Sequence, residues 1–240
     1  MLEGLKKGLY QTFILDDNYQ YFIKGIQTTL IVTVFALILG VILGVIIAII
    51  RSAHDQQPER KKNIFLRIAN LICQIYLTVI RGTPMMVQLL IMWFVVWASA
   101  RATDGNMIRC AILAFGINSG AYVAEIIRSG IMSIDKGQME AGRSVGLTYA
   151  TTMRCVIIPQ AFKNVLPALG NELITLLKET SVVTVIGLRD LTKGALIIQS
   201  KTYQAFVPFF AIAAMYLVMV LGLSWLMGKL ERRMRQSDLR

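Results

Sequence analysis

The sequence predicts an all-α, polytopic membrane protein with five transmembrane helices. Of its 240 residues, 55% are hydrophobic and only 16% are charged, whereas a soluble domain carries about 25% charged residues. Apolar runs close to the length that crosses a bilayer recur along the chain, and the mean hydropathy is +0.60. The net charge of +11 resides largely at the ends of these runs, so membrane topology explains it better than nucleic-acid binding does.

Two of the expected crossings are plain apolar runs, because residues 25–50 and 205–228 contain no charged side chain. Residues 1–24 are too polar for the core of a signal peptide and are expected to form a short amphipathic lead-in outside the cytoplasm. Gly40 and Gly44 are spaced so that another helix can pack closely against them. We place the five crossings at about 25–50, 70–100, 108–130, 163–188 and 205–228.

The second crossing is expected to be interrupted. As one helix, residues 68–100 would measure roughly 50 Å, which is too long for a simple span. Gly82 and Pro84 should break this helix, because proline cannot continue it unperturbed. Residues 85–100 must then cross, while residues 67–80 either cross or lie in the interface. One face of the stretch is polar and should meet water, a cavity or another subunit: Arg67, Asn70, Gln74, Thr78, Arg81 and Gln88.

The third crossing also carries a polar face, made of Asn118, Tyr122, Glu125 and Ser129 at helical spacing. Glu125 lies near the end of the span beside Arg128, so we expect a local ion pair there. Asn118 and Ser119 lie deeper, and both interhelical hydrogen bonding and substrate contact remain open for them.

The fourth crossing is the least apolar, since it contains Lys163, Glu172, Lys178 and Glu179. Their spacing is typical of a helix that lines a wet path. Residues 189–204 are expected to form a polar connection to the last crossing.

The distribution of basic residues predicts the orientation. An odd number of crossings places the two termini on opposite sides of the membrane. Fifteen Lys and Arg residues lie in the connections 51–67, 128–163 and 229–240, and eight lie in the connections 1–24, 101–109 and 189–201. The positive-inside bias therefore predicts that the N-terminus lies outside and the C-terminus in the cytoplasm.

Residues 135–160 form a basic segment punctuated by glycines between the third and fourth crossings. Within it, Glu140-Ala141-Gly142 is followed by Gly146-Leu147 and later by Pro159. The small residues allow a partner to approach the backbone closely, and Gly146 supplies a turn with positive φ between two short helices. We interpret the segment as a short helix offered to a groove in a cytoplasmic partner, against the alternative of an ordinary loop.

The segment resembles the EAA loop of binding-protein-dependent ABC importers: EAA, three residues, G, nine residues, then I-x-LP. It departs from that pattern because Gly142 replaces the second Ala, and Val156 and Ile158 replace Ile and Leu. Other stretches, from about residue 20 onward, are similar to the polar amino acid branch of these permeases. They are Arg81-Gly-Thr-Pro with Gln88, residues 117–128, Ile158-Pro-Gln-Ala, residues 166–172 and Leu177-Lys-Glu.

This resemblance implies a permease of the ABC type I importer class, spanning residues 25–240, in the plasma membrane of a bacterium. It implies a second permease copy or paralogue, two ATP-binding cassette ATPase subunits and an extracellular binding protein that delivers an amino acid. The sequence contains no GxxxxGK[ST] motif, so we expect no cofactor on this chain and ATP on the ATPase. The coupling residues would be Glu140, Ala141, Gly142, Gly146, Leu147 and Pro159. The segment from Glu140 to Thr151 would act as a rigid lever that switches the spans between outward-facing and inward-facing states.

For substrate contact, Glu172 is the first choice, as the counter-charge to an α-ammonium group or a cationic side chain. Asn118 and Ser119 are assigned to the carboxylate, with Thr83, Gln88 and Tyr122 lining the path. Lys178 either joins this site or neutralises Glu172 or Glu179 in a structural ion pair.

Three rival functions remain at this point. A secondary amino acid transporter or channel explains the polar faces but not the docking segment. An intramembrane enzyme is disfavoured, because the sequence has no HExxH or GxSxG motif and no His within a span; the chain is expected to be non-catalytic and to hold no metal. A structural scaffold would not need Glu172 and Lys178 within the membrane.

Overall fold

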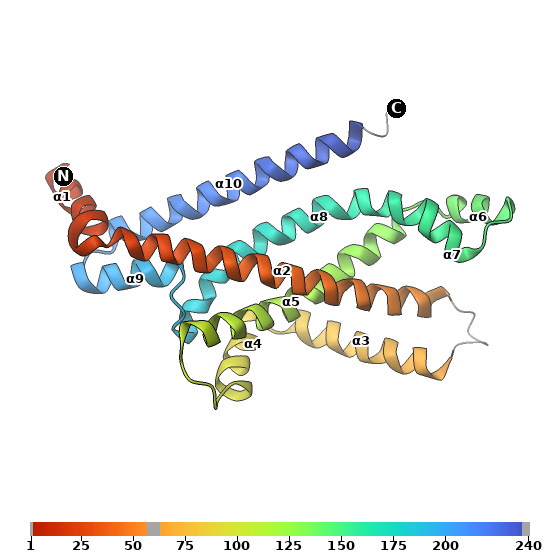
Figure 1. The fold of residues 1–240 in the computed structure, drawn as a ribbon, viewed down its shortest axis with the longest axis horizontal. Coiled ribbons are helices and arrows are strands. Elements are labelled where there is room, and N and C mark those ends of the chain that lie inside the picture. Colours follow the sequence, from red (N-terminus) through yellow and green to blue (C-terminus); the bar gives the residue numbers. More distant parts are fainter. Residues whose placement is uncertain (1, 57–62, 237–240) are drawn as a thin grey trace. The chain divides into compact units, whose positions relative to one another are not determined.

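The computed structural model describes residues 2–56 and 63–236, and these residues form helices with no β-strand (Figure 1). The basic run 59–62 and the last four residues of the tail lie outside the described residues. The α-helices are α1 (Leu2–Leu9), α2 (Tyr19–Gln56), α3 (Ile64–Gly82), α4 (Met85–Ile91), α5 (Asp104–Met132), α6 (Lys136–Ser144), α7 (Tyr149–Thr152), α8 (Ile158–Glu179), α9 (Leu191–Thr202) and α10 (Phe206–Gln236). Short π-helical turns cover Tyr10–Ile14, Met92–Val96 and Met153–Ile157, and 3₁₀ turns cover Leu15–Asp17 and Thr180–Ile186.

Within the described residues, four helices are long and apolar enough to cross a membrane: α2, α3, α5 and α10. The predicted break after α3 is confirmed, since the helix ends at Gly82 and Pro84 caps α4. The expectation that residues 85–100 make this crossing stays a prediction, although helix length favours α3. Met85–Val96 is shorter than a span, whereas the 19 residues of α3 suffice.

The fourth expected crossing is built from two pieces. Helix α8 contains Pro167 and ends at Glu179, and the chain continues as a 3₁₀ helix to Ile186. Gly187, with φ of +88°, ends that turn. Helix α8 has 22 residues, which is long enough to span, but it is not among the four helices that are also apolar enough, so the count of five crossings stays a prediction.

Residues 189–204 are not the expected polar connection, because most of them form α9. Asp190 caps this helix by accepting hydrogen bonds from the N–H groups of Thr192 and Lys193 at 3.0 and 2.9 Å. Leu191, Ala195 and Ile198, spaced four and three residues apart, are fully buried. Arg189, Asp190, Lys193 and Lys201 make the stretch polar in composition, so the apolar stripe was not predicted from it.

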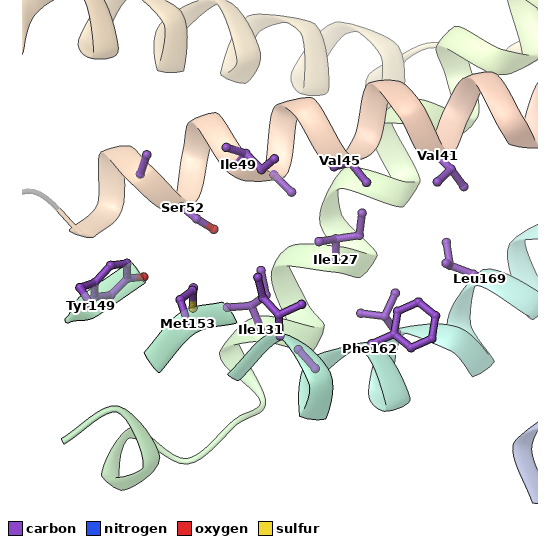
Figure 2. A pocket seen from close by; sticks show the side chains of 15 residues that line it. Val41, Val45, Ile49, Ser52, Ile127, Ile131, Tyr149, Met153, Phe162 and Leu169 are labelled. Carbon is purple, nitrogen blue, oxygen red and sulfur yellow. The ribbon is translucent and has the colours of Figure 1, made fainter. Parts of the chain in front are cut away.

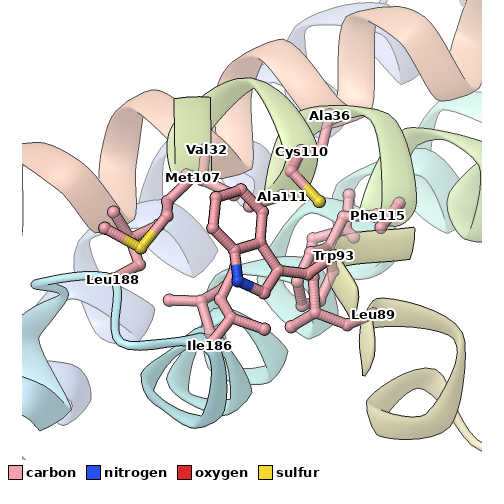
Figure 3. Close-up of a cluster of buried hydrophobic side chains, with 13 residues drawn as sticks. Val32, Ala36, Leu89, Trp93, Met107, Cys110, Ala111, Phe115, Ile186 and Leu188 are labelled. Carbon is pink, nitrogen blue, oxygen red and sulfur yellow. The ribbon is translucent and has the colours of Figure 1, made fainter. Parts of the chain in front are cut away.

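The described residues fall into two compact units. The first unit draws on Met1–Leu37, Pro84–Gly116 and Leu173–Ser224. Its largest core surrounds Trp93, whose ring lies among side chains that include Leu89, Phe115 and Ile186 (Figure 3). A second core joins Phe22 to the buried face of α9.

The second unit draws on Ile38–Thr83, Ile117–Glu172 and Trp225–Arg240. Its central contact is the close approach of α2 and α5. A Cβ atom at Gly40 would lie 2.8 Å from the Ser119 Oγ, and one at Gly44 would lie 2.5 Å from a methyl carbon of Val123. The expected close packing at these two glycines is thus confirmed. All the predicted coupling residues and most of the predicted substrate residues belong to this unit.

Candidate functional site: a polar hollow and a capped docking segment

Helix α6 begins and ends at residues suited to those positions. The Asp135 carboxylate accepts a hydrogen bond from the Gly137 N–H at 2.6 Å and caps the first turn. At the other end, the Leu147 N–H donates to the Gly142 carbonyl and the Gly146 N–H donates to the Arg143 carbonyl, both at 3.1 Å. This is a Schellman motif, and Gly146 takes the left-handed position with φ of +87°. The predicted glycine turn is confirmed.

The structure explains the absence of a side chain at Gly142 differently from the sequence analysis, which attributed it to close contact with a partner. Gly142 is buried, and a Cβ atom there would lie 2.4 Å from the Thr152 methyl carbon. The missing side chain therefore lets α6 pack against α7 of the same chain, rather than admitting a partner. Thr148 caps α7 by accepting from the Thr151 N–H at 3.2 Å, so the two short helices form one braced element.

The outer face of this element is open. Glu140, Ala141 and Pro159 are exposed, and Leu147 is half-buried. Val145 is 77% exposed, which is high for a branched apolar side chain. A small charged and apolar patch thus lies on a rigid support, as a docking helix requires.

The second unit also contains a polar hollow of about 510 Å³. Its lining side chains come from α3, α5 and α8: Arg81, Tyr122, Glu125, Ile126, Ser129, Gly130, Ser133, Asn164, Ala168 and Glu172. Two of the predicted substrate residues, Tyr122 and Glu172, are among them. One cation and two carboxylates therefore surround a space of the size of a small-molecule site.

Glu172 is held in place from α5. Ser119, which is fully buried, donates a hydrogen bond from its hydroxyl to the Glu172 carboxylate at 2.8 Å. The predicted assignment of Ser119 to a substrate carboxylate does not agree with this contact, because its hydroxyl proton already points to an acid. In this arrangement Ser119 fixes the orientation of Glu172.

Glu125 is the centre of a charge cluster that joins three helices. Its carboxylate lies 3.7 Å from Arg51 of α2, 3.5 Å from Arg81 of α3 and 3.6 Å from Arg128 of its own helix. The expected pair with Arg128 is confirmed. Arg128 also lies 3.6 Å from Asp55, so the cluster contains three cations and two carboxylates.

Arg81 is one of the residues of the hollow that the sequence reasoning did not select as a site residue. Its guanidinium stands 5.7 Å from the centre of the Tyr122 ring and also pairs with Glu125. Its place in the polar stripe of α3 was a signal that pointed to this role. Asn164 was missed as well; its amide donates to the Ser133 hydroxyl at 2.9 Å, and no pattern in the sequence marks it.

The remaining predicted substrate residues do not line this hollow. Asn118 is buried, and the Thr83 hydroxyl donates to the Val79 carbonyl of its own helix at 2.8 Å. Gln88 and Lys178 belong to the first unit. Among the residues that the structure describes, no group of three or more His, Cys, Asp or Glu side chains could hold a metal ion.

The family model and the related sequences that match this chain point to the same protein family. Residues 63–236 match the model of the binding-protein-dependent transport system inner membrane component. The arginine transport system permease protein ArtQ of Bacillus subtilis is 41% identical over 167 residues, which cover 70% of this chain and 76% of the relative. The glutamine transport system permease protein GlnP of Escherichia coli K12 is 39% identical over 168 residues, 70% of this chain and 77% of that protein.

Solved structures show the same fold. A crystal structure of an amino acid ABC transporter with histidines matches with a TM-score of 0.79 and 45% identity, over 90% of this chain and 94% of that one. An inward-facing MetNI methionine ABC transporter matches with a TM-score of 0.73 at 17% identity, over 92% of this chain and 99% of that one. The chain therefore belongs to the family of inner membrane components of binding-protein-dependent transport systems.

Proposed function

We propose that the chain is the permease subunit of an ATP-driven importer that moves a polar or charged amino acid into the cytoplasm. The family match supports this function over a secondary transporter or channel. The relatives act on arginine and glutamine by name, and both are polar amino acids. Transport would proceed by alternating access, with this chain non-catalytic and ATP bound by a separate subunit.

The observation that carries the proposal is the charge pattern of the polar hollow. An amino acid is a zwitterion, so its site needs both an anionic and a cationic side chain. Glu172 offers the counter-charge to an ammonium group or a cationic side chain, and Arg81 offers a guanidinium to the carboxylate. Tyr122 and Asn164 complete a lining that is partly aromatic and partly polar.

The docking element supplies the connection to ATP. We assign the exposed face at Glu140, Ala141 and Val145 to an ATPase subunit, with Gly146, Leu147 and Pro159 shaping the support. Because Gly142 locks α6 to α7, a push on this face would move both helices together, as a lever does. The chain contains no GxxxxGK[ST] phosphate-binding motif of its own.

The assembly would contain a second permease copy or paralogue and an extracellular binding protein. The polar stripe of α3 supports an assembly, since Arg67, Gln74 and Thr78 stay exposed in the single chain. An apolar helix with an exposed polar face is expected to meet a subunit or a water-filled path rather than lipid. The N-terminus would lie outside and the docking element in the cytoplasm.

Substitution of Glu172 tests the substrate site. Glu172→Gln keeps the shape and a hydrogen-bonding oxygen for Ser119 but removes the charge, so the apparent affinity for amino acid should fall about 10-fold or more. The measurement is uptake and substrate-stimulated ATPase activity of the reconstituted complex, with Glu3→Gln on α1 as the matched control. Uptake at wild-type affinity in Glu172→Gln would show that this carboxylate does not contact the substrate.

Substitution of Glu140 tests the partner. Glu140→Lys reverses the charge of the docking face without touching the α6–α7 contact, so co-purification of an ATPase subunit should be lost. Glu3→Lys makes the same change of charge at an exposed site on α1 and should leave the complex intact. If no ATPase accompanies the unmodified chain, the importer assignment is wrong.

A further inference from the structure

The charge cluster around Glu125 is one carboxylate short of balance. It contains two carboxylates and three guanidinium groups from α2, α3 and α5: Glu125, Asp55, Arg51, Arg81 and Arg128. His54 also approaches Asp55 at 3.5 Å and adds no charge in its neutral form. Among the described residues, the cluster therefore carries one positive charge in excess, which a further carboxylate would balance.

The ion pairs of Glu125 are long. Its Oε2 atom lies 3.5 Å from Arg81 and 3.7 Å from Arg51, and its Oε1 atom lies 3.6 Å from Arg128. Charge-assisted hydrogen bonds between a guanidinium and a carboxylate are about 2.7–2.9 Å long. Because none of the three pairs is that short, a carboxylate that comes within hydrogen-bond distance of Arg81 can replace Glu125 there.

Arg81 is the arginine of the cluster that a ligand in the polar hollow can reach. It lines the hollow, and its side chain is 44% exposed. Arg51 and Arg128 do not line the hollow, and their side chains are only 16% and 28% exposed. If Glu125 gave up Arg81, it would keep these two partners, so the exchange would leave no carboxylate uncompensated.

An apolar groove in the same unit cannot supply this counter-charge. It has a volume of about 460 Å³ and lies beside α2 (Figure 2). Its lining includes Val45, Ile49 and Phe162 and contains no charged side chain. The polar hollow, by contrast, has both Arg81 and Glu172 in its wall, so a zwitterion finds both signs of charge there.

We propose that Glu125 is an internal competitor of the substrate carboxylate for Arg81. This inference rests on the proposed function, because it concerns the same hollow. The carboxylate of a bound amino acid takes Arg81 from Glu125, which stays paired with Arg51 and Arg128. The exchange breaks the ion pair between α3 and α5, and the return of Glu125 to Arg81 expels the carboxylate. Glu125 is thus a positioning residue that keeps binding weak enough for release.

Glu125→Gln tests the competition by isothermal titration calorimetry on the purified transporter complex. A panel of the twenty common amino acids supplies the probe, and the α-carboxamide of the amino acid that binds best lacks the carboxylate. Glu125→Gln should bind the amino acid about 5-fold more tightly, because the competing charge is gone. Its affinity for the carboxamide should not increase.

Uptake into proteoliposomes separates this role from a structural one. In Glu125→Gln both KM and the maximal rate should fall, because tighter binding slows release, whereas a damaged fold would lower the rate without tightening binding. Asp55→Asn is the matched control, since it removes a carboxylate of the same cluster that pairs with Arg128 rather than with Arg81. It should change the affinity less than about 2-fold.

Glu125→Asp covers the case in which Glu125→Gln does not fold. It keeps a negative charge for the arginines but draws the carboxylate back from Arg81, so binding of the amino acid should tighten to a smaller extent. Unchanged or weaker binding in the folded Glu125 variants, or equal tightening in Asp55→Asn, would overturn the proposal. If no amino acid binds the unmodified complex, the proposed function is wrong, and this inference is rejected with it.

Discussion

Glu125 shows how a carboxylate is tolerated in a membrane helix. It lies within α5, and three arginines from three helices come within 3.7 Å of it. An isolated charge in the bilayer core costs about 2.5–3.5 kcal/mol even on an insertion scale, so a helix with this side chain must find partners. By pairing with Arg81, Glu125 also holds the guanidinium that faces the Tyr122 ring in the polar hollow.

Asp190, unlike the partly exposed Glu125, is a fully buried acid. Burial raises the pKa of its carboxyl above the usual value, and the N–H donors of Lys193 and Thr192 lower it by less. The folded state therefore binds this proton more tightly than the unfolded chain does. The corresponding stability is complete below the unfolded pKa and is lost as the pH rises through the folded pKa.

The raised pKa of the Asp190 carboxyl predicts how the stability of a variant should change with pH. Asp190→Asn keeps one acceptor for the cap and never ionises, so its stability relative to the unmodified chain should improve as the pH rises from 4 to 8. Asp190→Ala removes the cap and should cost about 1 kcal/mol. Thermal unfolding of the purified chain across this pH range is the measurement. The prediction would be contradicted if the stability of Asp190→Asn relative to the unmodified chain decreased as the pH rises from 4 to 8.

At the scale of elements, the docking element depends on a contact between two helices that are each too short to be stable alone. Caps at Asp135 and Thr148, the turn at Gly146 and the contact of Gly142 with Thr152 act together. An alanine at position 142, as in the strict EAA pattern, would not fit this chain unless residue 152 were smaller.

Gly142→Ala should therefore weaken the docking element. Its Cβ atom would lie 2.4 Å from the Thr152 methyl carbon, and overpacking of this kind costs about 1–3 kcal/mol. We expect faster proteolysis of residues 135–160 and weaker ATPase co-purification. Gly142→Ala combined with Thr152→Ala should recover part of both, because the nearest atoms are removed. Gly228→Ala, with open space around it, is the control and should have little effect.

At the scale of the whole molecule, orientation is the property that transport depends on most. Cys155 is exposed in the segment after the docking element, while Cys73 and Cys110 are buried. Tyr203, between α9 and α10, is 89% exposed. These two positions lie on connections that the positive-inside bias assigns to opposite sides of the membrane.

A membrane-impermeant maleimide should distinguish the two sides. In intact cells it should leave Cys155 unlabelled and should label Tyr203→Cys in a chain that also carries Cys155→Ser. In inside-out vesicles the pattern should reverse. Labelling of Cys155 from outside would place the docking element away from any cytoplasmic ATPase and would reject the proposed topology.

Much of the fold follows from local patterns in the sequence. Uncharged runs predicted α2 and α10, Pro84 predicted the break after α3, and Gly146 predicted the turn of the docking segment. Each of these depends on residues close together in the chain, where helix periodicity and backbone preference act directly. Helix α9 is also marked by a local pattern, since its cap at Asp190 and its apolar stripe can be seen in the sequence. The helix was not predicted, because the polar composition of residues 189–204 was given more weight.

The sequence by itself determined that this is a helical membrane protein with a glycine turn at position 146, because hydrophobicity and backbone preferences are properties of single residues and short stretches. Only the tertiary structure decided that Ser119 meets Glu172, that Arg51 and Arg81 converge on Glu125, and that Gly142 faces Thr152. Those contacts join segments that are distant in the chain. They depend on the rotation and depth at which each helix packs against its neighbours, which no local pattern specifies.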